Sequence, residues 1–214
     1  MADFDNIINF TLAAEGGLSN DPDDNASKYP SPYFFLGKNN YHTNKGITYK
    51  TFEAAAKLLD IENNFTNFIV MPKNVWAKIA KNVFWNRLNL DQLNNQAIAN
   101  LLFSWFWGSG YNFRNRIKKY LASNNIYWNI NEVKKLPSLL NILIKKKGAN
   151  SVYNSIEQTY KQYLISLNQN KFIKGWLKRL QDLKEINLNY LSSKKNILLP
   201  VTIVLFLGYL YSKR

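Results

Sequence analysis

One acidic side chain near the N-terminus has the sequence context of a catalytic acid. Glu15 follows a segment in which Phe4, Ile8 and Leu12 recur at helical spacing, and two glycines come directly after it. This pattern predicts a helix over residues 4–15, with the Glu15 carboxylate on its apolar face and the glycines ending it sharply. Partial burial and the negative end of a helix dipole both disfavour an ionised carboxylate, which suits a general acid. The plainer alternative is a solvated glutamate near a helix end.

Two polar motifs follow Glu15-Gly16-Gly17, and together the three resemble a known family. They are the run Asn20-Asp21-Pro22-Asp23-Asp24 and the run Thr43-Asn44-Lys45-Gly46-Ile47-Thr48, which leads into a predicted helix. This order is similar to that of the N-acetylmuramidases of glycoside hydrolase family 108, which include phage-type endolysins. The family usually has Pro-Gly-Gly closely after the Asp-rich run, whereas here the aromatic, loop-like stretch 25–42 intervenes. The resemblance covers about residues 4–183, and the N-terminal motifs are its specific part.

The resemblance implies a mainly α, lysozyme-like helical fold with a small β element beside the active-site cleft. It implies hydrolysis of the β-1,4 link between N-acetylmuramic acid and N-acetylglucosamine, with Glu15 protonating the leaving oxygen. A second group would hold or activate water at the opposite face of the sugar. Asp24 is the first candidate for this second group, and Asp21 and Thr48 stand behind it. The motifs also predict substrate-binding side chains at Asn20, Thr43 and Asn44.

No metal or organic cofactor is required by this chemistry. The sequence has no cysteine and a single histidine, His42. That leaves little material for a zinc site or a histidine-dependent triad, so hydrolysis through a covalent Ser or Cys intermediate is not expected.

After Thr48 the chain reads as almost wholly helical. The strongest apolar pattern, at residues 98–105, predicts a helix that runs into Gly108-Ser109-Gly110. In the family, a similar point opens a peptidoglycan-binding module. Sugar rings pack on aromatic faces, so Trp107 and Tyr111 are candidates for a saccharide groove, with a core role as the alternative, and Trp105 is predicted to be core. Residues 174–179, Lys-Gly-Trp-Leu-Lys-Arg, resemble the closing Gly-x-Gly-Trp-x-x-Arg element of the family.

We therefore expect three regions. Residues 1–90 would form the muramidase catalytic region, and residues 91–192 a helical, peptidoglycan-binding-like region packed on it. Residues 194–214 would form a C-terminal hydrophobic helix that anchors the protein in a membrane, because 197–211 are uncharged and lysines flank them. A buried core segment is the alternative for this tail. No secretory signal is recognisable, so an anchored enzyme would reach the wall as a phage lysis protein in the host membrane or as a virion-associated protein.

The net charge of +14 is unevenly distributed. Residues 1–62 carry nine acidic and five basic side chains, whereas the remainder carries five acidic and twenty-three basic ones. The basic part favours polyanions such as anionic wall polymer or membrane, although a solvated lysine-rich face is an equal alternative. Bacterial peptidoglycan is the expected partner, and nucleic acid is not expected. Two other functions stay open, namely a non-catalytic, membrane-tethered wall-binding or virion structural protein and a basic nucleic-acid-binding protein.

Overall fold

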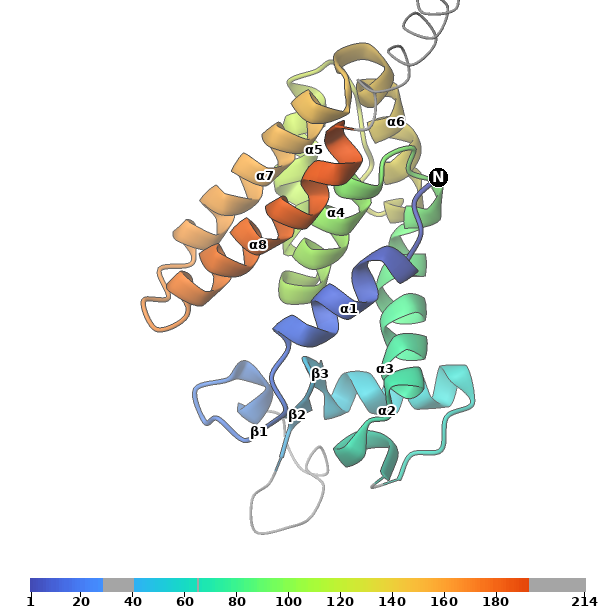
Figure 1. The fold of residues 1–214 in the computed structure, drawn as a ribbon, viewed down its shortest axis with the longest axis vertical. Helices are drawn as coiled ribbons and strands as arrows, with labels where there is room; N and C mark the ends of the chain where they lie inside the picture. Colours follow the sequence, from blue (N-terminus) through green and yellow to red (C-terminus); the bar gives the residue numbers. More distant parts are fainter. Residues whose placement is uncertain (29–40, 65, 193–214) are drawn as a thin grey trace, which may run out of the picture.

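The described chain is mainly helical, with one small antiparallel sheet, as predicted (Figure 1). The computed structural model describes residues 1–28, 41–64 and 66–192. The strands are β1 (Leu18–Ser19), β2 (Thr43–Asn44) and β3 (Ile47–Thr48). The α-helices are α1 (Asp5–Ala14), α2 (Tyr49–Leu59), α3 (Lys73–Ile79), α4 (Gln96–Ser109), α5 (Arg114–Ala122), α6 (Leu136–Lys147), α7 (Ala149–Ser166) and α8 (Ile173–Ser192). Helix α3 continues as a π-helix over Ala80–Trp85, and another π-helix spans Thr66–Val70.

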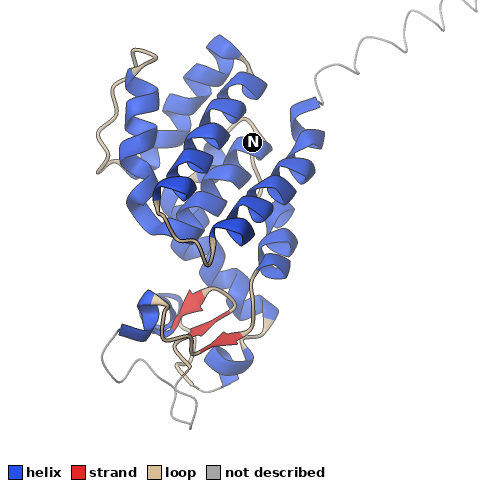
Figure 2. Ribbon diagram, turned by 90° about the vertical axis from the view of Figure 1, so that its left-hand side faces the viewer, coloured by secondary structure: helices blue, strands red, loops and turns tan. Residues whose placement is uncertain are grey.

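Helix α1 brings the candidate acid to the junction between the helices and the sheet. Figures 1 and 2 show the sheet and α2 on one side of α1 and the helices α4–α8 on the other. The face that α1 buries contains Phe4, Ile7 and Thr11, and the predicted Ile8 and Leu12 are partly buried against the same core. Glu15 is the next residue along this buried face, four positions after Thr11.

The end of α1 differs from the prediction in one detail. Glu15 already leaves the helix in an extended conformation, with φ −87° and ψ 140°, and its amide donates to the Thr11 carbonyl. Neither Gly16 nor Gly17 has a positive φ. The two glycines are therefore not needed for a left-handed helix end, because the turn out of α1 is made by Glu15 itself.

The three strands form a sheet in the order β1-β2-β3. Strands β2 and β3 are joined by the two-residue turn Lys45-Gly46, and both residues have a positive φ, +46° and +76°. A turn with two left-handed residues matches the twist of a hairpin and favours glycine. The pairing places Ser19 opposite Thr43 and Thr43 opposite Thr48, whereas Ile47 and Asn44 are buried. One face of the β2–β3 hairpin is thus buried, and the other is polar and partly exposed.

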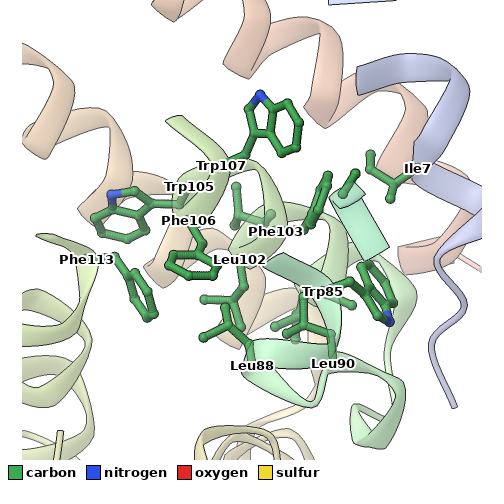
Figure 3. Packing of buried hydrophobic residues seen from close by; sticks show 14 of the residues in the cluster. Ile7, Trp85, Leu88, Leu90, Leu102, Phe103, Trp105, Phe106, Trp107 and Phe113 are labelled. Carbon is green, nitrogen blue, oxygen red and sulfur yellow. The ribbon is translucent and has the colours of Figure 1, made fainter. Parts of the chain in front are cut away.

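Helix α4 is the centre of the hydrophobic core. Every residue from Ala97 to Trp107 is buried, because α1, α7 and α8 pack around this helix. Trp105 is fully buried, as predicted, and its ring stacks on Tyr160 at 4.6 Å between centroids. Figure 3 shows the aromatic side chains of α4 gathered with Trp85 and Phe113. This rigid helix positions Trp107, its last buried residue.

A buried polar network ties α8 to α4 and α7. Asn100 Nδ2 donates to Asn187 Oδ1 at 2.8 Å, and Asn187 Nδ2 donates to the Tyr153 hydroxyl at 3.3 Å. Asn100 and Asn187 are both fully buried, so these bonds fix how α8 lies along the core. The buried hydrophobic cluster contains residues from both sides of the boundary predicted at residue 90, and that boundary stays a prediction.

The membrane anchor predicted for residues 194–214 lies outside the described residues, as does most of the 25–42 stretch. Among the helices that the structure describes, none combines the length and apolar character needed to cross a bilayer.

Candidate active site

The Glu15 carboxylate is held by groups from three distant parts of the chain. Its Oε1 accepts hydrogen bonds from the Trp107 indole Nε1 at 2.8 Å and from Arg179 Nη1 at 2.5 Å. The Glu15 side chain is 12% exposed and that of Arg179 is 24% exposed. The carboxylate is thus partly buried, as predicted, but it also has a cationic partner on α8. Burial of both groups strengthens their attraction by limiting screening by water.

The second carboxylate oxygen faces the turn of the β-hairpin. A Cβ atom built on Gly46 would lie 2.4 Å from Glu15 Oε2 and 3.0 Å from Trp107 Cζ2. Only glycine allows the hairpin to approach the carboxylate this closely. Oε2 has no hydrogen-bond partner among the residues that the structure describes. The two oxygens therefore differ, because Oε1 accepts two donors and Oε2 is the one left for a proton or a substrate.

Side-chain hydrogen bonds at the two residues before Gly46 fix the position of this hairpin. Asn44 Nδ2 donates to the Phe68 and Ile69 carbonyls at 2.7 and 2.8 Å. The Trp76 indole Nε1 donates to the Lys45 carbonyl at 2.9 Å. Asn44 is 1% exposed, so its side chain holds the hairpin in place, and its predicted contact with substrate stays a prediction.

Trp107 donates its indole N–H to the site, and its ring packs in the core. The side chain is 9% exposed and packs against Trp76, Phe84 and Phe103 at centroid distances of 5.3, 4.6 and 5.8 Å. In Figure 3 its ring lies at the end of α4, beside Phe103. An indole that is packed on several sides holds its N–H in one direction, so Trp107 is a rigid donor to Glu15. This burial argues for a positioning role instead of an open sugar-stacking face.

Tyr111 makes its contacts elsewhere. Its hydroxyl accepts from Arg87 Nε at 2.6 Å, and the Arg114 guanidinium lies 4.4 Å from its ring centre. No contact joins it to Glu15 within the described parts of the chain. A groove that includes Tyr111 stays a prediction.

The three candidates for the second catalytic group all make local contacts. Asp24 Oδ1 accepts from the Ala26 amide at 3.0 Å and starts the 3-10 turn Asn25–Lys28. Thr48 Oγ1 caps α2 by accepting from the Thr51 amide at 3.2 Å. Asp21 Oδ1 accepts from the Asp23 amide at 2.9 Å. Each of these oxygens stabilises its own turn or helix end, so the three residues hold the backbone at the sheet in place.

Asp21 also takes part in a contact between that backbone and the α7–α8 connection. Lys171 Nζ lies 3.2 Å from Asp21 Oδ2 and 2.8 Å from Asp23 Oδ2. The Asp23 amide, and then Lys171, lower the pKa of Asp21 below its usual value. All three side chains are well exposed, so the two ion pairs that Lys171 makes contribute little to stability.

The remaining predicted binding residues lie on the same sheet or directly after it. Thr43 Oγ1 is 2.9 Å from His42 Nδ1 and lies on the polar face of the sheet, opposite Thr48. Asn20 follows β1 and is exposed. Both are placed where a bound polymer could reach them, and their contacts with substrate stay predictions.

Arg179 contacts Glu15 but was not predicted from the sequence as a site residue. It lies in the Gly-Trp-Leu-Lys-Arg segment quoted for its resemblance, and this was the available signal. Its Nε and Nη2 atoms are buried without a hydrogen-bond partner in the described structure. Among the described residues, Glu15 is therefore the one hydrogen-bonding partner of this guanidinium.

Comparison with known proteins agrees with this geometry. The family model described as glycosyl hydrolase 108 matches residues 8–110, a range that includes Glu15, Gly46 and Trp107. No curated protein matches the chain. Among solved structures, SagA of Brucella abortus is similar in fold, with a TM-score of 0.61 over 88% of this chain and 95% of that one, at 17% identity. The chain therefore carries a glycosyl hydrolase 108 domain and is a glycoside hydrolase.

Proposed function

We propose that the protein is an N-acetylmuramidase that cleaves the β-1,4 glycosidic link of bacterial peptidoglycan, with Glu15 as general acid. The observation that carries this proposal is the difference between the two Glu15 oxygens. Two donors hold Oε1, while Oε2 is free of hydrogen bonds in the described structure. A proton on Oε2 can be transferred to the glycosidic oxygen without breaking the contacts that orient the carboxylate.

Asp24 remains the first candidate for the group that holds or activates water, and Asp21 and Thr48 remain alternatives. Asp21 and Asp24 follow β1, and Thr48 ends β3, in the sheet whose hairpin turn meets Glu15. Asp24 uses Oδ1 for its own turn, which leaves Oδ2 for water. Asp21 is already paired with Lys171, and this pairing makes it the weaker candidate. Asp24→Asn should then reduce turnover more than Asp21→Asn.

The direct test is release of reducing ends from purified peptidoglycan by wild-type protein and by Glu15→Gln. The variant keeps the size of the side chain and an oxygen that can accept from Trp107 and Arg179, but it has no transferable proton. Loss of general acid catalysis should lower kcat by about 10²–10⁴-fold. Glu185→Gln is the matched control, because Glu185 is an exposed carboxylate on α8. Wild-type turnover by a Glu15→Gln protein with a native circular dichroism spectrum would reject the assignment.

We further propose that the protein acts in phage-mediated lysis or as a virion component, held at the host membrane by residues 197–211. What supports this is the uncharged sequence of the tail with lysines on both sides. Partitioning of the full chain into detergent, compared with that of a chain ending at Ser193, tests the anchor. Equal partitioning of the two chains would reject it.

A further inference from the structure

The contact between Arg179 and Glu15 crosses the predicted boundary between a catalytic region and a wall-binding region. Arg179 lies on α8, 164 residues after Glu15, and outside the range 8–110 that matches the family model. Its Nη1 nevertheless makes the shortest contact to the carboxylate, at 2.5 Å. The segment with the specific motifs therefore does not contain every group that touches Glu15.

We propose that Arg179 is a positioning residue for Glu15, so that α8 completes the active site instead of belonging to a separate wall-binding module. This inference rests on the proposed role of Glu15 as general acid. Arg179 acts through Glu15 and is not itself assigned a contact with substrate.

A carboxylate that has a single donor keeps rotational freedom. Held by Trp107 alone, the group could exchange its two oxygens by rotating about its terminal bond, because either oxygen can accept the same N–H. A second donor on Oε1, coming from a different helix, removes this freedom. The carboxylate then keeps Oε2 towards Gly46 and the hairpin turn. Trp107 on α4 and Arg179 on α8 together decide which oxygen carries the transferable proton.

The surroundings of Arg179 point to the same role. Its Nε and Nη2 find no partner in the described structure, so the guanidinium is not held by a network of its own. Instead, its backbone is fixed by the buried bonds of α8, through Asn187, to Asn100 and Tyr153. A group that is anchored by its helix and directed at one carboxylate oxygen is suited to orient that carboxylate.

The test compares Arg179→Gln and Arg179→Lys with Lys178→Gln. Lys178 is the adjacent residue on α8, has a 75% exposed side chain and pairs only with Asp182 on its own helix among the described contacts. For each full-length variant, kcat and KM are measured on a soluble peptidoglycan oligosaccharide, and binding to insoluble peptidoglycan is measured by sedimentation. Thermal unfolding monitors the fold.

We expect kcat of Arg179→Gln to fall about 100-fold, the loss expected when a catalytic group is displaced by about 1 Å. KM and wall binding should change by less than about two-fold, because the contact does not involve substrate. Arg179→Lys should retain part of the activity, since an ammonium supplies charge but not the planar fork. Added guanidinium at non-denaturing concentration should restore some kcat to Arg179→Gln and none to Glu15→Gln.

Three results would overturn the proposal. A folded Arg179→Gln protein with the kcat of Lys178→Gln would mean that Glu15 needs no second donor. A rise in kcat would mean that Arg179 restrains the acid, and a change confined to KM would make it a substrate-binding residue. If Arg179→Gln does not fold, Arg179→Lys decides between these outcomes. A wild-type protein without activity on peptidoglycan would reject the proposed function itself, which is a distinct result.

Discussion

Substitution of Gly46 by alanine should have two measurable effects. One is displacement of the catalytic acid, and the other is a loss of stability of the hairpin. The new Cβ would lie 2.4 Å from Glu15 Oε2 and 2.7 Å from Cδ, whereas real Cβ contacts essentially never fall below 3.0 Å. Glu15 or the turn must therefore move by at least 0.6 Å. Trp107, at 3.0 Å from the same Cβ, limits movement on its side.

Two separate costs follow from this geometry. The left-handed backbone, with φ +76°, is strained for alanine and should reduce the free energy of unfolding by about 1–3 kcal/mol. The displaced carboxylate should reduce kcat/KM by about 100-fold, because catalysis is sensitive to misplacement of about 1 Å. Reducing-end release measures the second cost, and thermal or urea unfolding measures the first.

Two other glycines provide the controls. Gly148 has φ +82° with open space around its Cβ position, so Gly148→Ala carries backbone strain without a clash. Gly17 has open space and no positive φ, so Gly17→Ala carries neither. If Gly46→Ala is folded and retains the kcat/KM of Gly148→Ala, the close approach of the hairpin to Glu15 is not catalytically important and the reasoning fails.

Three further predictions concern stability and binding. Burial raises the pKa of Tyr160 to about 12, so burial of its neutral form contributes fully to stability below pH 10. That contribution is lost as the pH rises through 12. Tyr160→Phe should therefore reduce the loss of stability at alkaline pH, measured by urea unfolding. Asn44→Ala leaves the Phe68 and Ile69 carbonyls without their donor and should lower the free energy of unfolding by about 2–4 kcal/mol, measured in the same way. Added salt should weaken sedimentation with peptidoglycan more than it slows cleavage of a short oligosaccharide, and equal sensitivity would leave the basic surface as a solvated face.

The elements that could be predicted were those whose sequence pattern lies within the element itself. The helical spacing before Glu15 and the apolar run of α4 each indicated the helix that is observed. These signals depend on neighbouring residues, and periodicity reports on neighbours directly. Phe4 is buried as predicted, whereas Ile8 and Leu12 are only partly buried, because a spacing of three or four residues fits two adjacent stripes of a short helix.

The roles of individual polar residues were harder to predict. Asn44 was predicted to bind substrate, and the structure shows in addition that its amide donates to two backbone carbonyls that are 24 and 25 residues away. Trp107 was open between a saccharide groove and the core, and it packs in the core while donating its N–H to Glu15. A motif specifies which residue types meet at a site, but it does not state which of them touch substrate and which hold the others in place.

Arg179 illustrates where inference from local sequence ends. Nothing near Glu15 indicates that a guanidinium from α8 will reach it, because that contact depends on how α8 packs against α4. The packing is determined in turn by buried pairs such as Asn100 and Asn187, which are 87 residues apart. The resemblance of residues 174–179 to a family element singled out this segment, but it did not indicate a contact between Arg179 and Glu15. Its importance follows from the structure, in which the ionised donor and the partly buried carboxylate meet at 2.5 Å, so that the proposed general acid depends on the last described helix.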